Sequence, residues 1–263
     1  MIRLLKRVAR KAIDLRKKFR ANKLHRSYER NSGYCVICEQ ETVFVIYHSW
    51  LRDNYKCERC NTIPRNRALI NSVNIFSPDW KNLQVHESSP GGKVSEFLKK
   101  NCKDYCSSHY YTDVERGKYK GEHRSEDLCQ LTFEDNSFDL FLTSDVFEHV
   151  MEPEKAFSEI ARVLKPGGMH IFTMPWYPKL KKTVQRASLN EDGTINYLEE
   201  AVYHGNPIAG EGSLVTFDWS LDFTDFIFLH SGMTTTIFVD RDRKKGIDGE
   251  FIEVFISRKP DGK

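Results

Sequence analysis

Long hydrophobic runs are missing from this sequence of 263 residues. No window approaches the roughly 18 consecutive apolar residues that a membrane-spanning helix needs. The first residues, Met1–Arg7, are interrupted by charge too early to supply the apolar region of a secretory leader. The sequence therefore predicts a cytoplasmic protein and leaves contact with a membrane surface open.

Acidic side chains are scarce at the start of the chain. Residues 1–30 contain 12 lysines and arginines but only two acids, whereas the remaining residues contain 28 basic and 35 acidic side chains. The body of the protein is thus mildly acidic and carries a basic arm. This distribution argues against a nucleic-acid enzyme, whose working face is broadly positive.

The basic arm, residues 1–30, has the pattern of an amphipathic helix. Its apolar residues follow helical spacing on one face, and the other faces are basic. Those residues are Leu5, Val8, Ala12, Leu15 and Phe19. Three roles stay open for such a helix. It packs on its own domain or on a partner protein, it attaches to an anionic membrane surface, or it binds RNA.

Cysteine is also sparse, yet four of the seven cysteines form a pattern. Cys35 and Cys38 make one Cys-x-x-Cys pair, and Cys57 and Cys60 make a second pair after 18 intervening residues. Four thiolates at this spacing are typical of a structural zinc ion. The sequence shows no export signal that would favour disulfides instead. We therefore expect a zinc-ribbon-like module over residues 31–65 with a strand at 42–47. Redox dithiols without a metal are the alternative.

From residue 66 to residue 263 the chain alternates between helix and strand patterns, which predicts an α/β domain with a mostly parallel sheet. The expected strands are 82–86, 109–112, 138–143, 170–173, 234–239 and 251–257, and the expected helices include 94–98, 156–164 and 221–231. Residues 176–218 interrupt the alternation. A polar segment of that length predicts a lid or substrate-binding insertion.

Acidic residues and glycine mark the ends of the first two strands of this domain. Glu87 ends the first strand, Gly91 lies in the turn that follows, and Asp113 ends the second strand as predicted. In open α/β sheets, ligands bind outside the carboxyl ends of the strands. The three residues suit a nucleoside cofactor.

The later segments carry a family resemblance. They are Glu126-Asp127-Leu128, Asn136-Ser137-Phe138-Asp139, the run Thr143–Val150 (TSDVFEHV) and the run Ala161–Gly168 (ARVLKPGG). In this order they resemble the class I S-adenosylmethionine-dependent methyltransferases, in particular the small-molecule branch that includes quinone-biosynthesis enzymes. The resemblance implies a Rossmann-like domain with a mostly parallel seven-stranded sheet and S-adenosylmethionine as the cofactor.

The resemblance also implies roles for single residues. Glu87 and Gly91 hold the amino-acid part of the cofactor, Asp113 the ribose, Asp127 and Leu128 the adenine, and Ser144 and Asp145 line the pocket beside the methyl group. The chain departs from the family in the first turn, where Ser89 and Lys93 stand at positions that are usually glycine. This departure restricts backbone approach to the cofactor and predicts modest affinity.

Catalytic candidates lie in two segments. His204 or Tyr203, in the insertion, is expected to act as a general base on an acceptor hydroxyl. His149, with Asp145 and Glu148, is the second candidate group. In some relatives a comparable cluster holds a divalent metal, and the alternative is that Glu148 and His149 brace the helix entry.

The sequence thus predicts a methyltransferase that acts on oxygen or nitrogen of a small molecule or glycan. The chain lacks the Asn/Asp-Pro-Pro-aromatic run that is typical of enzymes methylating the exocyclic amines of bases. Two alternatives stay open. The zinc-ribbon pattern and the basic arm fit an RNA methyltransferase, and the altered turn fits a catalytically inactive partner protein.

Overall fold

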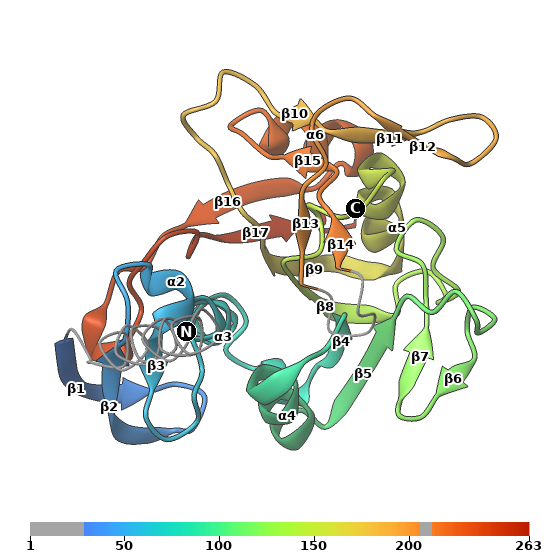
Figure 1. Cartoon of the computed structure of the whole chain (residues 1–263). Helices are drawn as coiled ribbons and strands as arrows, with labels where there is room; N and C mark the ends of the chain where they lie inside the picture. The colour runs from blue at the N-terminus through green and yellow to red at the C-terminus, as the bar shows by residue number, and fades with distance from the viewer. Residues whose placement is uncertain (1–28, 206–211, 263) are drawn as a thin grey trace, which may run out of the picture.

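The computed structural model describes residues 29–205 and 212–262 (Figure 1). The basic amphipathic helix expected in residues 1–30 lies almost wholly outside them. Within the described residues, no helix is both long enough and apolar enough to cross a membrane.

A small antiparallel sheet holds both cysteine pairs. Its strands are β1 (Glu29–Cys35), β2 (Gln40–Ile46) and β3 (Tyr55–Cys57), in the order β1-β2-β3. Strand β2 confirms the strand expected at 42–47. The short helix α2 (Leu51–Asn54) connects β2 to β3. Figure 1 shows this cysteine module, residues 29–65, packed beside helix α3 (Pro64–Phe76), the first residues of which it includes.

The central sheet is Rossmann-like and mostly parallel, as expected. Its order is β16-β17-β9-β8-β4-β5-β7-β6. The pairs among β4, β5, β7, β8 and β9 are parallel, and β6, β16 and β17 add antiparallel edges. The strands are β4 (Gln84–Ser88), β5 (Asp104–His109), β6 (Tyr119–Lys120), β7 (His123–Ser125), β8 (Phe138–Ser144), β9 (Leu164–Thr173), β16 (Thr234–Phe238) and β17 (Val254–Arg258).

Helices cover both faces of this sheet because alternate strand residues point to opposite faces. Leu140 and Leu142 of β8 pack with α3 and with α4 (Gly92–Asn101), whereas Phe141 packs with α5 (Pro153–Val163) and α6 (Phe223–Ser231). Two short 3-10 helices, η1 (Trp80–Asn82) and η2 (Arg243–Lys245), complete the described helices. The expected helices at 94–98, 156–164 and 221–231 are confirmed within a few residues.

The cysteine module shares a hydrophobic core with the larger domain. Phe44 and Tyr55 of the module are completely buried in one cluster with Ile70 of α3 and Leu140 of β8. Arg67 of α3 is also completely buried and donates to the carbonyl oxygens of Tyr55 and Gly246. The module is therefore fixed against the domain by packing as well as by hydrogen bonds.

Two sequence predictions about this sheet were wrong. The second strand is not 109–112 but β5, which ends at His109. The aromatic run Tyr110-Tyr111 favoured the prediction, but residues 104–109 are the ones that pair in parallel with β4 and, at their end, with β7. The sheet has eight strands instead of seven because a two-residue strand, β6, pairs with β7 at the edge.

A boundary of β9 also differs from the expectation. The strand begins at Leu164, so Lys165–Gly168 lie inside it and not in a turn before it. The pairing of β9 with β8 has an irregularity between Phe138 and Leu140, and Gly167 takes φ 74° there. A glycine accepts this left-handed conformation without strain, so the strand bends where the sequence indicates a stop.

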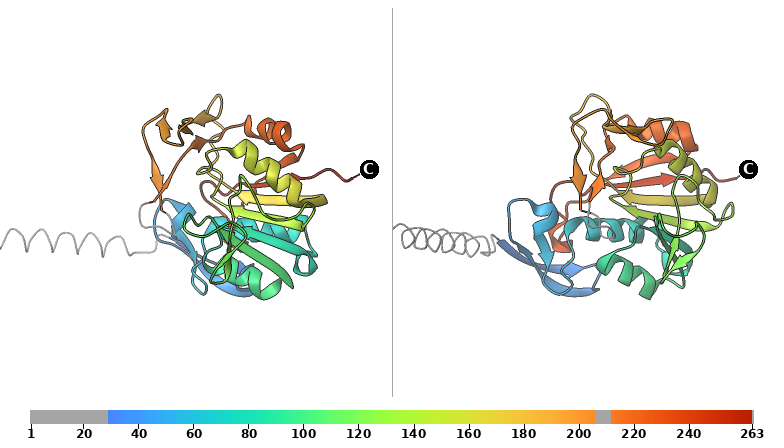
Figure 2. Two further views of the ribbon diagram at one scale, coloured as in Figure 1. Left: turned by 90° about the vertical axis from the view of Figure 1, so that its right-hand side faces the viewer. Right: turned by 45° about the vertical axis from the view of Figure 1, so that its right-hand side comes forward.

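Among the described residues of 176–218, short strands pair outside the central sheet (Figure 2). Strands β10 and β15, β11 and β12, and β13 and β14 pair antiparallel. Their bounds are β10 (Val184–Gln185), β11 (Ala187–Leu189), β12 (Ile195–Tyr197), β13 (Tyr203–His204), β14 (Ser213–Leu214) and β15 (Phe217–Asp218). Several hydrogen bonds join this insertion to the segment after β8, among them Thr216 N to Glu148 O at 2.7 Å and Thr216 Oγ1 to Val150 O at 2.8 Å.

Candidate active site

Glu87 lies at the carboxyl end of β4, as the sequence predicts, but its side chain is bound by neighbours. Ser95 Oγ donates to one carboxylate oxygen at 2.9 Å and the Tyr105 hydroxyl donates to the other. Burial raises the pKa of Glu87 to about 7, and these two hydrogen bonds oppose the shift. The carboxylate is therefore held in place at the base of the turn.

The turn after β4 keeps a glycine-like backbone despite its altered sequence. Ser89 takes φ 56° and Gly92 takes φ 61°, both in the left-handed region, whereas Gly91 is extended. A side chain added at Gly91 or Gly92 would meet no atom within 4 Å among the described residues. The backbone here is thus open to close approach by a ligand, which fits the cofactor that the resemblance implies.

The residues expected at the ribose and adenine follow β5 and β7. Asp113 comes four residues after the end of β5, is largely exposed and binds Lys120 Nζ at 2.7 Å. That hydrogen bond holds the pKa of Asp113 below its ordinary value. Asp127 follows β7 and accepts from Cys129 N at 2.9 Å, and Leu128 packs against the core. Their roles toward the cofactor stay predictions.

Ser144 and Asp145 end β8 beside the neighbouring strand. Ser144 Oγ lies 3.1 Å from Thr173 Oγ1, which donates to Asp145 Oδ1 at 3.1 Å. Asp145 takes φ 53°, a conformation that aspartate tolerates better than most residues and that is found at functional sites. The turn directs the Asp145 carboxylate out of the sheet.

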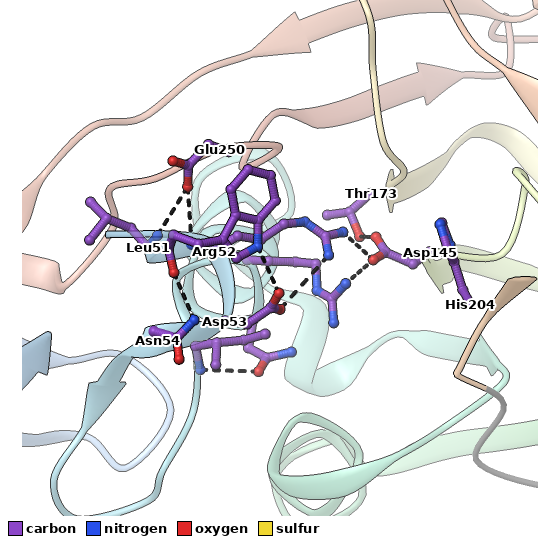
Figure 3. A network of polar contacts seen from close by, with 12 residues as sticks. Leu51, Arg52, Asp53, Asn54, Asp145, Thr173, His204 and Glu250 are labelled. Carbon is purple, nitrogen blue, oxygen red and sulfur yellow. Dashed lines mark hydrogen bonds and ion pairs between the residues drawn. The ribbon is translucent and has the colours of Figure 1, made fainter. Parts of the chain in front are cut away.

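Two arginines that the sequence did not single out bind this carboxylate. Arg52 of α2 and Arg65 of α3 both form ion pairs with Asp145 Oδ2. Figure 3 shows Arg52 reaching Asp145, Thr173 on the same carboxylate and His204 on its other side. No sequence pattern marked the arginines, because single arginines in a basic chain carry no motif. The cysteine module therefore contributes side chains to the end of β8.

Three residues after Asp145, the buried carboxylate of Glu148 lies next to two histidines. Glu148 is 1% exposed, and neither of its carboxylate oxygens has a hydrogen-bond partner in the described part of the chain. Oε1 lies 3.8 Å from His149 Nε2 and 3.9 Å from His204 Nδ1. Burial raises the pKa of Glu148 to about 7, although Arg52 and Arg65 oppose the shift.

The histidines of this cluster are poised in their neutral forms. Burial lowers the pKa of both His149 and His204. When neutral, His149 donates from Nδ1 to the Leu214 carbonyl at 2.8 Å, which leaves the lone pair of Nε2 directed toward Glu148. The expected candidates His149 and His204 are thus brought together. Tyr203 is not, because its hydroxyl lies 3.3 Å from that of the exposed Tyr197.

The four module cysteines converge on one point. Cys35 Sγ lies 3.7 Å from Cys60 Sγ, and Cys38 Sγ lies 3.8 Å from Cys57 Sγ. Bonds of about 2.3 Å to a tetrahedral zinc ion place neighbouring sulfur atoms about 3.8 Å apart. The geometry fits a closed four-thiolate site with no open position.

A separate cavity of about 460 Å³ runs along α4 and β5. Gly91 is the only member of the expected cofactor set that lines it; its other walls include Lys99, Lys103 and Tyr119. The cavity therefore extends away from the carboxyl ends of β4 and β8, and we do not assign the cofactor to it.

The order and pairing of the strands are those of a Rossmann-like α/β domain. Residues 88–172 match the family described as a methyltransferase domain. This central segment of the chain is therefore similar to a methyltransferase domain.

Known proteins with similar sequences cover parts of the chain. An uncharacterized methyltransferase of Schizosaccharomyces pombe is 30% identical over 135 residues, which are 48% of this chain and 44% of that protein. Demethylmenaquinone methyltransferase of Clavibacter sepedonicus is 36% identical over 77 residues, 27% of this chain and 31% of that protein. The chain thus spans less than half the length of these relatives.

Solved structures align with the chain at low identity. An S-adenosylmethionine-dependent methyltransferase of Mesorhizobium loti is 14% identical with a TM-score of 0.47, over 73% of this chain and 97% of that one.

Proposed function

We propose that this protein is an S-adenosylmethionine-dependent methyltransferase that transfers the methyl group to oxygen or nitrogen of a small molecule or glycan. The bound sulfonium cofactor supplies an activated methyl group, so the protein mainly has to align the acceptor, exclude water and take up a proton. The similarity to demethylmenaquinone methyltransferase supports a small-molecule acceptor.

The observation that carries this proposal is the cluster of Glu148, His149 and His204 near the end of β8. A hydroxyl or amine acceptor must lose a proton as it is methylated, and a base with a pKa near the operating pH does this best. Glu148, with its pKa raised to about 7, and two neutral histidines meet that requirement. In this proposal His204, which is 40% exposed, receives the proton and Glu148 stabilises the charge.

The same three residues also offer one ligand atom each within 4.8 Å of one another. A divalent cation held there would lower the pKa of an acceptor hydroxyl and replace the base. The two versions make different predictions. Activity that survives a chelator, with a proton-linked pH profile, supports the base, whereas activity restored by added Mg²⁺ or Mn²⁺ supports the metal.

For the cysteine module we propose a structural zinc ion bound by Cys35, Cys38, Cys57 and Cys60. The sulfur spacing and the absence of an open position support a role in folding, not in catalysis. Metal analysis of the purified protein tests this directly: one zinc per chain is expected, and a metal-free protein with two disulfides would exclude it.

The experiment that tests the activity screens phenols, amines and sugars for methylation with labelled S-adenosylmethionine, using Glu148→Gln as a matched control. Acceptor-dependent methylation that falls with the variant is expected. Cofactor binding without methylation of any acceptor would favour the inactive partner protein.

A further inference from the structure

We propose that Arg52 and Arg65 form a binding site for an anionic group of the acceptor, a phosphate or a carboxylate, in which Asp145 occupies part of the site when no acceptor is bound. This inference rests on the proposed methyl transfer and adds the class of acceptor to it.

The cysteine module places both arginines at the end of β8. Arg52 lies on α2, between the two cysteine pairs, and Arg65 lies in the first turn of α3, just after the second pair. Their side chains are only 12% and 20% exposed. Burial lowers the pKa of Arg65 to about 10, so its guanidinium is still charged at neutral pH. Two cations are thus held close together in a partly dehydrated site.

One donor group of each of these arginines is unused. Nε of Arg52 and Nε of Arg65 are buried and have no acceptor among the described residues. Arg67, only two residues away on α3, is the contrasting case: its Nε donates to Gly246 O at 3.0 Å, and its terminal nitrogens bind further carbonyl oxygens. Buried donors are normally paired. Arg67 therefore has the contacts of a structural arginine, and the other two have the contacts of a binding site.

The two arginines share few ion-pair partners, although the carboxylates of Glu148 and Glu253 also act to raise the pKa of Arg52. Two guanidinium groups share one Asp145 oxygen, and the further acid Asp53 is half exposed and 3.9 Å from Arg52. A buried pair of cations that serves structure alone is expected to have matched acceptors, because uncompensated buried charge is destabilising. A planar guanidinium fork matches the oxygens of phosphate or carboxylate. An anionic group satisfies the free donors.

The position assigns this anion to the acceptor. His204, the proton acceptor of the proposed reaction, lies on the other side of Asp145 (Figure 3). Both arginines also act to lower the pKa of His204, so we infer that a molecule bound by them lies near this base. The cofactor has a carboxylate of its own, which is the competing source of the same chemistry, so the test has to separate the two.

The experiment titrates the zinc-loaded, full-length protein with inorganic phosphate by calorimetry, with and without saturating S-adenosylhomocysteine. The variants are Arg52→Gln, Arg65→Gln and Asp145→Asn, and Arg30→Gln removes an exposed charge of the same module as a matched control. We expect either active-site arginine variant to weaken phosphate binding about tenfold or more, and Arg30→Gln to have no effect. Asp145→Asn is expected to strengthen it, because the competing carboxylate charge is removed. Destabilisation cannot produce that gain.

The remaining outcomes separate the possibilities. Phosphate affinity that is equal in all variants, while S-adenosylhomocysteine still binds, would overturn the anion site and leave the proposed function intact. Competition between phosphate and S-adenosylhomocysteine, with Arg65→Gln weakening both equally, would overturn the assignment to the acceptor and give the arginines to the cofactor carboxylate. Failure of every form, including the parent, to bind S-adenosylhomocysteine would remove the proposed function itself.

Discussion

The cysteine module and the 176–218 insertion both reach the end of β8, but they do so with different chemistry. The module contributes Arg52 and Arg65 from elements that pack against a shared hydrophobic core. The insertion contributes His204 from a two-residue strand next to exposed apolar side chains such as Tyr203 and Leu198. One region brings fixed charge, and the other brings a neutral base.

This difference follows from what each group requires. A buried cation destabilises the fold unless the groups around it are correctly placed. We therefore expect it on an element that is held by packing and, as we propose, by metal ligation. A proton acceptor has to meet substrate and solvent, which suits a more exposed loop. The comparison predicts that damage to the module affects stability first, whereas damage to the insertion affects the rate first.

The largest effect is expected from Cys57→Ser. Loss of one thiolate weakens zinc binding, and structural zinc contributes on the order of 10 kcal/mol to folding in small modules. We expect zinc loss and a much lower melting temperature, measured by metal analysis and thermal unfolding. The control is Cys102→Ser, which changes a buried cysteine outside the module. This variant should retain the zinc bound by the module. A Cys57→Ser protein with unchanged melting would contradict the contrast between the two regions.

Glu148→Gln is expected to lower kcat by about 10²–10⁴-fold, because it removes the group that stabilises the transferred proton. In the parent the rate should rise with pH through about 7 as Glu148 ionises, and the variant should lose this step.

The stability of the parent protein should fall over the same pH range in which its rate rises. The pKa of Glu148 in the folded protein, about 7, lies above the ordinary glutamate value of 4.5, so protonation favours the folded state. The stabilisation is complete below about 4.5 and is lost as the pH rises through 7. Glu148→Gln cannot ionise and should therefore unfold at a higher temperature than the parent at pH 8. Equal melting of the two proteins across this range would show that Glu148 is not a buried, raised-pKa carboxylate.

His204→Ala tests the insertion alone. We expect kcat to fall about 10²-fold while the melting temperature stays within a few degrees, since the side chain is 40% exposed. The exposed His48→Ala is the control and should leave both quantities unchanged. A large loss of stability in His204→Ala would mean that the insertion, like the module, is part of the structural frame.

The smallest effect is expected from Ser89→Gly in the turn after β4. Ser89 holds φ 56°, which costs a non-glycine residue about 1 kcal/mol, so glycine should raise stability slightly and tighten S-adenosylhomocysteine binding a few-fold. Calorimetry and thermal unfolding measure both. A Ser89→Gly variant with weaker binding would show that the serine hydroxyl contacts the cofactor.

The sequence predicted the architecture because the signals for it are local. The two Cys-x-x-Cys pairs, the strong β8 pattern and the helix stripe of α5 each depend on neighbours within a few residues, and all three are confirmed. Strand limits were harder to predict. The strand that ends at His109 is held by its parallel neighbours and not by its own composition.

The site was predictable only in part for the same reason. His149 and His204 were identified because they lie in recognisable segments, and the structure places them together with Glu148. Arg52 and Arg65 were missed because they approach Asp145 from 93 and 80 positions away in the sequence, and only the packing of the module on the sheet brings them there. Contacts between elements that are distant in the sequence produce no local sequence pattern.

The central claim is that the carboxyl ends of β4, β5 and β8 bind S-adenosylmethionine. The most direct test is calorimetric titration of the zinc-loaded protein with S-adenosylhomocysteine, repeated on Asp113→Ala. The account predicts one site per chain and binding that weakens at least about tenfold in the variant, because Asp113 is proposed to accept from both ribose hydroxyls. Absence of binding by the parent protein, with zinc present and the fold intact, would contradict it.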